Sequence, residues 1–566
     1  MGGLADRLRA LRRRLGATRS LWRAAPAALG AIDSPQAGEA IGTERLALGG
    51  WALFASGPAT RIEAFLGDRP LGRARLGLPR PDVASGSPQA AAEISGFELS
   101  AALGDLPAGE ATLRLEATGA QGEQMQLGPV SVLLGERPWA EDRKPLPPPA
   151  PITPPAPRRG GARLLAATHR LDLGGAQLYL CELLEALLEA GAANPTVISS
   201  VDGPLRGRLE EKGIPVHISS PLPDYDRAAH VGRVEELSSW AQGRDFEAVL
   251  VNTASPFAFP AAEVAQRLGV PAIWAIHESY RPKELWADLD PGVRELAEAA
   301  LRGAKLAIFE SASTMELYRS HLSEDQCLAL PYGIDLEAID SQRANLDKRA
   351  IREREGVPQD AQLILCLGAI EPRKAQIPLA QAFAGVAGQN PKAHLHFFGE
   401  WGDEASTALS HYCASLPFAD RIEVMPLTQD VHSAHAIADL LVCPSDIESL
   451  PRAVLEAMAW QTPVLASDVF GLGELIEDGR SGWLCPPRDT GALAEGLQRA
   501  LDSSPEQRSA IAGVARERIE QCHTLEGYAR RFAGVLGSVV GERVLGGNGS
   551  GAVLVMDREE VAAAVE

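Results

Sequence analysis

From residue 161 onward, short apolar segments alternate with stretches of helical length, and this alternation restricts the fold more than any other feature. Such alternation is typical of parallel strands joined by right-handed helical crossovers. The strands predicted in a first run are 163–167, 195–199, 248–252, 272–276 and 305–309. A second run is predicted at 363–367, 394–398, 422–425, 440–443 and 464–466. Each run can form one open sheet, so we expect an α/β fold with two Rossmann-like domains facing a cleft, where ligands bind beyond the carboxyl ends of the strands.

The domain boundaries follow from this alternation. We expect an N-terminal α/β domain over residues 161–345 and a C-terminal α/β domain over residues 346–520. A helix at 521–540 is expected to return to the N-terminal domain, and residues 541–566 are expected to form a tail.

The residues before 161 have a different pattern. Residues 31–136 contain short alternating segments separated by Gly, Pro and Asp, which predicts a small all-β sandwich as an accessory domain. Its Trp51 and Phe97 are able to stack on a sugar, although the sandwich core is the commoner place for such residues. Residues 137–160 are proline-rich, which predicts a semi-rigid spacer.

The first 30 residues predict a basic amphipathic leader helix. Seven arginines lie between Arg7 and Arg23, and Pro26 ends the helical pattern. The apolar stripe comprises Leu4, Leu8, Leu11, Leu15 and Trp22. Residues 1–25 therefore suit an anionic membrane surface, with a solvated helix or one docked on a partner as the alternative.

Bulk properties limit the partners and the compartment. A net charge of −20 argues against nucleic-acid binding, which needs clustered cations. Seven cysteines without a CxxC pair argue for a reducing compartment and against a disulfide framework or a structural zinc site. No apolar run reaches the roughly 18 residues that span a bilayer. We expect a cytoplasmic protein, with peripheral attachment at the inner face of the membrane if the leader helix binds lipid.

The segment after Cys443 contains the clearest chemical pattern. A predicted strand ends there, a loop follows, and a helix is predicted to begin near Pro451, whose missing N–H suits a first helical turn. The N–H groups around Ser449, Leu450 and Arg452, together with the helix dipole, favour an anion.

Glu448 and Glu456 lie eight positions apart around this anion site. Carboxylates repel a phosphate but are suitable partners for sugar and ribose hydroxyls. The segment 443–464 resembles the E-x7-E element of retaining glycosyltransferases of family 4, which have the GT-B fold.

Companion motifs of that family occur in the same order along the chain, and the resemblance covers about residues 161–540. They are the glycine loop Gly174–Gln177, the histidine motif Ile276–Glu278, the element Pro331–Asp335 that opens the linker, the basic loop Leu365–Gln376, and the closing loops Asp468–Glu474 and Gly479–Pro487.

The resemblance implies a site for a nucleotide diphosphate sugar, with four residues expected to act in catalysis. Arg373 and Lys374 would hold the diphosphate, where two cations stabilise a leaving group that gains negative charge. Glu448 would bind hydroxyls of the donor sugar, and His277 would contact the same sugar.

Five further residues are expected to bind substrate. Gly174 and Gly175 would let the backbone approach the phosphate or the acceptor closely. The backbone N–H groups of Ser449 and Leu450 would touch phosphate or sugar, and Glu456 would accept hydrogen bonds from the ribose hydroxyls.

Two positions depart from the family pattern. The arginine that often follows the glycine of the basic loop is replaced by Ala369, and the glycine usual after the lysine is replaced by Ala375. We expect Arg373 to supply the missing charge.

No Asp-x-Asp motif lies at a predicted strand end, so no essential metal and no cofactor are expected. Arg373, Lys374 and the helix dipole would take the place of the ion. In the family's retaining mechanism the acceptor attacks from the leaving-group face and a donor phosphate oxygen takes its proton, so no protein nucleophile is required. The acceptor would be a glycan or a lipid-linked glycan in bacterial surface polysaccharide biosynthesis.

Three alternatives remain open from the sequence. One is an inverting GT-B transferase with His169 or His277 as the general base. Another is a non-catalytic nucleotide-sugar-binding protein, and the third is an assembly scaffold dominated by the sandwich and the leader helix.

Overall fold

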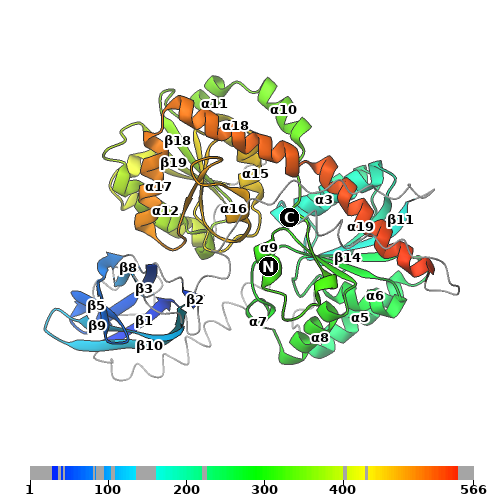
Figure 1. Cartoon of the computed structure of the whole chain (residues 1–566), viewed down its shortest axis with the longest axis horizontal. Coiled ribbons are helices and arrows are strands. Elements are labelled where there is room, and N and C mark those ends of the chain that lie inside the picture. The colour runs from blue at the N-terminus through cyan, green and yellow to red at the C-terminus, as the bar shows by residue number, and fades with distance from the viewer. Residues whose placement is uncertain are drawn as a thin grey trace. The chain divides into compact units, whose positions relative to one another are not determined.

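The computed structural model describes residues 28–35, 40–41, 45–78, 80, 83, 95–103, 109–134, 161–219, 226–287, 289–399, 404–426 and 431–545. The predicted spacer at 137–160, and the leader helix except for residues 28–30, lie outside the described residues. Residues 28–30 belong to a strand, so the range expected for the leader helix was too long at its end. The chain divides into two compact units, one containing the N-terminal strands together with residues 407–416 and 488–491, and the other containing both α/β sheets (Figure 1).

The N-terminal unit contains two sheets whose inner faces share one hydrophobic core. The first has the order β1-β3-β8-β7, with β4 on β3, and the second the order β2-β10-β9-β5-β6. Their bounds are β1 Ala28–Ser34, β2 Ala40–Ile41, β3 Arg45–Phe54, β4 Gly57–Pro58, β5 Arg61–Leu66, β6 Arg69–Arg73, β7 Arg75–Leu78, β8 Gly96–Ala102, β9 Gly109–Thr118 and β10 Gln124–Leu134. All pairs are antiparallel except β2 with β10. Phe97 is buried in this core, whereas Trp51 is half-buried beside the Arg80 guanidinium group.

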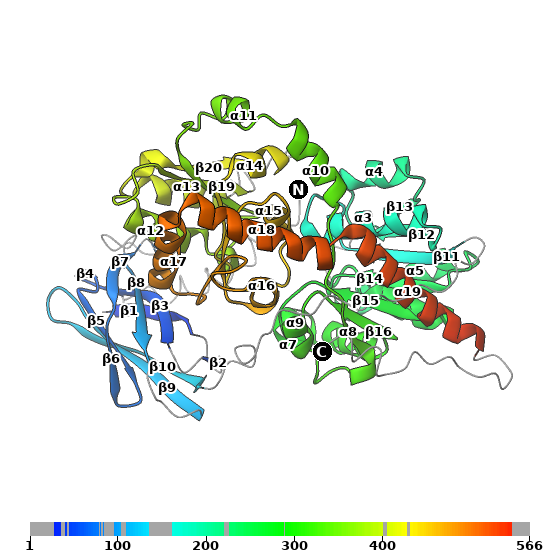
Figure 2. The same ribbon diagram turned by 45° about the horizontal axis from the view of Figure 1, so that its top comes forward.

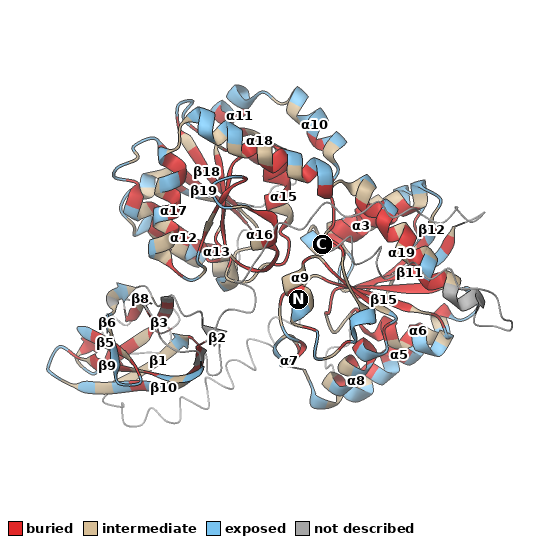
Figure 3. Ribbon diagram, in the orientation of Figure 1, coloured by how far each residue is buried: buried red, intermediate tan, exposed pale blue. Residues whose placement is uncertain are grey.

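The first α/β domain has one parallel seven-stranded sheet in the order β13-β12-β11-β14-β15-β16-β17. The strands are β11 Ala162–Thr168, β12 Ala193–Ser199, β13 Val216–Ile218, β14 Ala248–Asn252, β15 Ala272–Ile276, β16 Leu306–Phe309 and β17 Cys327–Ala329. Every residue of β14 and β15 is buried, because helices cover both faces of the sheet (Figure 3).

The second α/β domain repeats this plan with six parallel strands in the order β20-β19-β18-β21-β22-β23. The strands are β18 Gln362–Leu367, β19 Ala393–Gly399, β20 Ile422–Pro426, β21 Leu440–Cys443, β22 Val464–Ser467 and β23 Trp483–Cys485. In both sheets the strand order reverses beside the first strand of the domain, as in a Rossmann fold.

Helices connect the strands of both domains. They are α3 Gly175–Glu189, α4 Leu205–Glu211, α5 Arg227–Ala241, α6 Pro260–Leu268, α7 Pro282–Leu285, α8 Pro291–Arg302, α9 Ala312–Glu316, α10 Leu336–Asn345, α11 Lys348–Arg354, α12 Gln376–Val386, α13 Glu404–Ala414, α14 Val431–Ile437, α15 Arg452–Ala459, α16 Phe470–Leu475, α17 Thr490–Asp502, α18 Pro505–Cys522 and α19 Leu525–Leu545, with 3-10 turns η2 Glu324–Gln326, η3 Pro372–Lys374 and η4 Ala419–Arg421.

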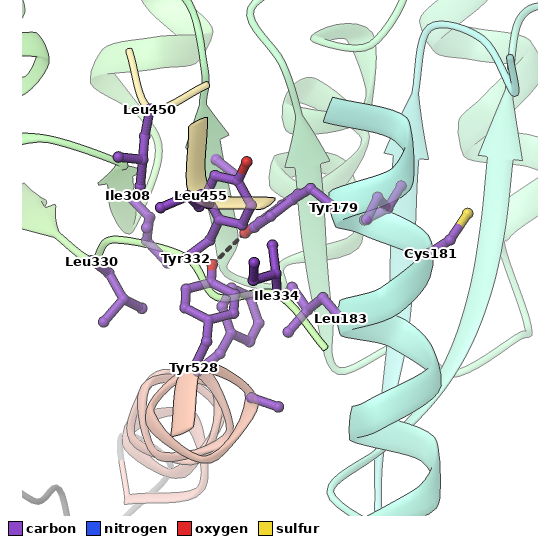
Figure 4. Packing of buried hydrophobic residues seen from close by; sticks show 14 of the residues in the cluster. Tyr179, Cys181, Leu183, Ile308, Leu330, Tyr332, Ile334, Leu450, Leu455 and Tyr528 are labelled. Carbon is purple, nitrogen blue, oxygen red and sulfur yellow. Dashed lines mark hydrogen bonds between the residues drawn. The ribbon is translucent and has the colours of Figure 1, made fainter. Parts of the chain in front are cut away.

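The last two helices belong to different domains. α18 packs against α15, whereas α19 packs against α3, β11 and β14 (Figures 1 and 2). The returning helix therefore begins at Leu525 rather than at residue 521, because residues up to Cys522 continue α18. Tyr528 of α19 and Tyr179 of α3 form a hydrogen bond between their hydroxyl groups in the shared core (Figure 4).

Candidate donor site

The site in the second α/β domain lies where the strand order reverses, beyond the carboxyl ends of β18 and β21. Loops diverge at such a point and leave room for a ligand. Gly368 directly follows β18 with φ of 143°, a conformation that side-chain-bearing residues rarely adopt, and a Cβ atom there would have open space around it. The loop after β21 contains Glu448.

The two predicted cations and the first predicted glutamate come together at this point. The Lys374 ammonium group pairs with the Glu448 carboxylate. Arg373 places Nη1 3.5 Å from Glu448 Oε2 and Nε 2.9 Å from Glu371 Oε2. Nη1 also donates to the Ile447 carbonyl at 3.3 Å. The loop after β18 and the loop after β21 are therefore joined by charged side chains.

Electrostatics keeps both cations charged. Burial opposes the charge on Lys374 and on Arg373, but the Glu448 carboxylate raises the pKa of each above its ordinary value. The side chain of Lys374 is 17% exposed and that of Glu448 13%. These groups are thus partly withdrawn from water, which strengthens their interaction with a charged ligand.

Ala375 explains why glycine is usual at its position in the family. It has φ of 53° and ψ of 36°, a left-handed conformation that glycine tolerates best, and it is buried at the start of α12. The departure from the family pattern thus costs backbone strain at this position.

Ser449 and Leu450 precede α15 and present backbone donors. Among the described residues, none accepts a hydrogen bond from the backbone N–H of either. The Leu450 side chain packs in the core near Ile308 (Figure 4), and Ser449 Oγ lies 3.3 Å from Thr314 Oγ1. The side chains of Ser449 and Leu450 thus pack against the protein, whereas their backbone N–H groups stay available to donate to a ligand at the start of α15. Anions bind at such helix starts.

Glu456 lies deeper in the protein than its expected ribose contact suggested, because only 7% of its side chain is exposed. Its Oε1 accepts from Arg452 Nε at 2.7 Å, and its Oε2 lies 3.4 Å from His435 Nε2. Burial alone would raise its pKa, but Arg452 and His435 outweigh burial and lower the pKa to about 2. The carboxylate is therefore ionised and held in one orientation.

The glycine loop lies in the first domain, after β11. A Cβ atom on Gly174 would fall 2.3 Å from Gln177 Oε1, so the end of the Gln177 side chain would have to move to admit a larger residue. A Cβ atom on Gly175, the first residue of α3, would meet nothing within 4 Å. Of the two, Gly175 is the one that leaves open space for a ligand.

His277 follows β15 and already uses both ring nitrogens. Asn252 Nδ2 donates to the Ala176 carbonyl at 2.9 Å, so Asn252 Oδ1 faces His277 Nε2 at 2.8 Å and requires a proton there. Nδ1 lies 2.5 Å from Glu310 Oε1. Burial opposes protonation, but Glu310 raises the pKa of His277. Both ring nitrogens of His277 are therefore engaged by neighbouring side chains.

His169, the other candidate base, is neutral because burial lowers its pKa to about 4. Its Nε2 lies 3.1 Å from the Gln177 amide nitrogen, which donates to it, and its Nδ1 lies 3.3 Å from Thr253 Oγ1. Both nitrogens are therefore engaged by neighbouring side chains.

Sequence reasoning missed Glu310, Asn252 and the role of the Arg452 side chain. Glu310 was open to detection, because it follows β16 just as His277 follows the paired strand β15. Across the described ranges, no group of three or more His, Cys, Asp or Glu side chains could hold a metal ion. None of the described helices is long and apolar enough to cross a membrane.

Two protein-family models match the chain, one over each α/β domain. Residues 174–333 match the model of a "Glycosyl transferase 4-like domain", and residues 347–518 match "Glycosyl transferases group 1".

Curated relatives are named D-inositol 3-phosphate glycosyltransferase. The protein from Geodermatophilus obscurus is 32% identical over 253 residues, which are 42% of this chain and 55% of that protein. This match spans about half the length of that relative. The protein from Thermobispora bispora is 26% identical over 372 residues, which are 61% of this chain and 86% of that protein.

Solved structures share the fold at lower identity. Anabaena Alr3699/HepE in complex with UDP and glucose has a TM-score of 0.57 at 19% identity and covers 66% of this chain and 99% of its own. WaaG, a glycosyltransferase involved in lipopolysaccharide biosynthesis, has a TM-score of 0.53 at 17% identity, with coverage of 66% and 99%. The predicted GT-B fold is confirmed, and the chain belongs to the glycosyltransferases of the group 1 and 4-like families.

Proposed function

We propose that this glycosyltransferase transfers its sugar with retention of anomeric configuration, using a nucleotide diphosphate sugar at the site formed by Arg373, Lys374 and Glu448. The observation that carries the proposal is the pairing of Lys374 with Glu448 where the strand order reverses. A diphosphate that takes the place of Glu448 at Lys374 leaves the carboxylate free to accept hydrogen bonds from the donor sugar.

The charge arrangement supports departure of a diphosphate. Negative charge grows on the leaving group in the transition state, and preoriented cations stabilise it most when they are partly buried. Arg373 and Lys374 meet that requirement, and the N–H groups of Ser449 and Leu450 add neutral donors at the start of α15. We propose that no metal ion is required, so transfer should survive EDTA. Loss of activity that added Mg²⁺ or Mn²⁺ restores would contradict this part.

The state of the histidines supports retention over inversion. An inverting transferase needs a general base on the acceptor. Both ring nitrogens of His277 are engaged by Asn252 and Glu310, and the acceptor nitrogen of His169 is engaged by Gln177. We assign the acceptor proton to a donor phosphate oxygen instead.

The anomeric configuration of the product, followed by proton NMR during the first turnovers, tests this assignment. An inverted product would overturn it, and loss of that product in His169→Ala would then identify the base.

The donor and the acceptor are proposed by chemical class. The Anabaena neighbour is described with UDP and glucose, so the first step is to measure thermal shifts with UDP, GDP, ADP and CDP. The nucleotide that binds is then tested with different sugars attached to it.

We propose a glycan or lipid-linked acceptor of bacterial surface polysaccharide biosynthesis. A cytoplasmic enzyme would reach this acceptor at the membrane surface through residues 1–25. Binding to anionic vesicles that weakens with salt, and no binding to neutral vesicles, is the expected result.

A further inference from the structure

Arg452, the first residue of α15, joins two carboxylates from different α/β domains. Its Nε donates to Glu456 Oε1 at 2.7 Å, one turn further along the same helix. Its Nη1 and Nη2 donate to Glu182 Oε2 and Oε1 at 2.7 and 2.9 Å. Glu182 lies on α3, the helix that begins at Gly175 in the first domain. One guanidinium group therefore connects the glycine-loop helix to the second glutamate of the E-x7-E element.

The three side chains are largely withdrawn from water. The exposed fraction is 19% for Arg452, 10% for Glu182 and 7% for Glu456. Burial opposes the charge on Arg452, but the two carboxylates raise its pKa, so the guanidinium stays charged. A planar guanidinium that donates from Nε and from both Nη atoms to two carboxylates fixes the rotation of each partner, which a flexible ammonium group does not.

We propose that Arg452 is a positioning residue that holds the Glu456 carboxylate in the orientation required by the ribose hydroxyls, and that Glu182 holds Arg452. The inference rests on the proposed function, in which Glu456 accepts from the ribose. A carboxylate has about four lone-pair sites, so the contacts with Arg452 and His435 leave acceptor capacity for a hydroxyl. Ribose recognition in the second domain thus depends on a side chain of the first.

Arg516 provides a matched control for a purely structural role. Its Nε donates to Glu520 Oε1 at 2.7 Å, one turn further along α18, and its Nη1 and Nη2 donate to Asp340 at 2.8 and 2.7 Å. The hydrogen-bond pattern repeats that of Arg452, and the side chain is 10% exposed. Arg516 Nη1 also donates to the Ala459 carbonyl at 2.8 Å, and within the described part of the chain Arg516 donates no hydrogen bond to a predicted donor-site residue.

Glu474 provides a control for any hydrogen-bonded contact between the two α/β domains that does not involve Glu456. Its carboxylate accepts from the backbone N–H groups of Ala312 and Ser313 at 3.0 and 2.7 Å, so it joins α16 of the second domain to the first turn of α9 in the first. It does so without touching Glu456.

The test compares a ribonucleoside diphosphate with its 2′,3′-dideoxy counterpart, using the full chain and the base selected by the thermal-shift panel. Both dissociation constants are measured by calorimetry. The wild type should prefer the ribose form by about 10-fold or more, because hydrogen bonds to a charged group contribute about 1.5–3 kcal/mol. Glu456→Gln and Arg452→Met should both reduce this preference to within about 3-fold of equality. Arg516→Met and Glu474→Gln should keep the wild-type preference.

Two further variants separate orientation from charge and from folding. Arg452→Lys keeps the positive charge but loses the planar set of guanidinium N–H donors. Its preference for the ribose form should therefore lie between those of the wild type and Arg452→Met. Glu182→Gln should lower the preference, and adding it to Arg452→Met should have no further effect, since both act through one guanidinium group.

The outcomes distinguish this inference from the proposed function. A wild-type preference in Arg452→Lys and in folded Arg452→Met, with a lost preference in Glu456→Gln, would overturn the positioning role alone. An equal loss in Glu474→Gln would overturn it as well, because domain contact in general would then be the cause. A wild type that binds no nucleoside diphosphate, or a Glu456→Gln variant with an unchanged preference, would instead remove the proposed ribose contact itself.

Discussion

The hydroxyl groups of Tyr179 and Tyr528 form a hydrogen bond inside the core, and the two residues are 349 positions apart (Figure 4). The bond ties the C-terminal helix α19 to α3 of the first α/β domain. Tyr179 also contacts His277 edge to face, with ring centroids 4.7 Å apart. Helix α19 therefore contributes part of the hydrophobic core of the first α/β domain.

Tyr528→Phe should lower the free energy of unfolding by about 1–3 kcal/mol, because it leaves the buried Tyr179 hydroxyl without its partner. Tyr179→Phe should cost a similar amount for the same reason. The double variant should lose less than the sum of the two, since no hydroxyl is then left unpaired. Urea unfolding of the four proteins checks this. Additive losses would mean that the two hydroxyls do not interact.

A chain that begins at Gly160 should fold and bind the nucleoside diphosphate with the affinity of the full chain. The sandwich core draws all its buried residues from the first 134 positions, and no predicted donor-site residue lies among them. Thermal unfolding and calorimetry of the shortened chain measure both properties. Insolubility, or affinity more than 10-fold weaker, would mean that the α/β domains require the N-terminal unit.

The α/β plan could be read from the sequence because central parallel strands are apolar throughout. Prediction and structure agree on both ends of β14 and β15, where every residue is buried. The strands β13, β17 and β23 were not predicted, since each has only three residues and lies at the edge of its sheet. Three residues are too few for a strand pattern to be detected in the sequence.

The partners of the candidate residues could not be read in the same way. Lys374 and Glu448 were both predicted for the donor site, but their pairing depends on β18 lying beside β21, which a linear pattern does not contain. Glu182 is a charged residue in an otherwise apolar stretch of α3, and its partner Arg452 lies 270 positions away. Long-range ion pairs of this kind require the fold before they can be recognised.

Stability should fall as the pH is lowered from about 6.5 towards 4, because burial lowers the pKa of His169, His396 and His523 to about 4. In that interval the unfolded chain binds protons that the folded chain does not, so each histidine costs about 1 kcal/mol at pH 5.5. Urea unfolding at pH 7.5 and 5.5 measures the difference. His396→Leu should reduce it by about 1 kcal/mol.

Lys374→Ala is expected to lower kcat by about 10²-fold or more while changing the donor KM less, by analogy with the loss of an oxyanion donor. The reason is that the charge on the departing diphosphate grows in the transition state, so an interaction with it is seen in turnover. Glu456→Ala should instead raise KM more than it lowers kcat, since ribose hydroxyls change little during reaction. Glu448→Gln should fall between the two, with a larger effect on the choice of donor sugar.

Removal of Lys374 also leaves Glu448 without its strongest partner, and the measurement must separate this effect from lost catalysis. The double variant Lys374→Ala with Glu448→Gln removes the unpaired charge, and its kcat is compared with that of Glu448→Gln alone. A kcat far below that of Glu448→Gln, in a double variant whose thermal stability has recovered, assigns the additional loss to the missing ammonium group. Lys392→Ala is the matched control, because Lys392 pairs with Asp360 at 3.1 Å on the surface, where the two side chains are 62% and 71% exposed. Its kinetics should stay at the wild-type level, since exposed pairs contribute little. A folded Lys374→Ala protein with wild-type kcat and KM would show that the diphosphate is held elsewhere.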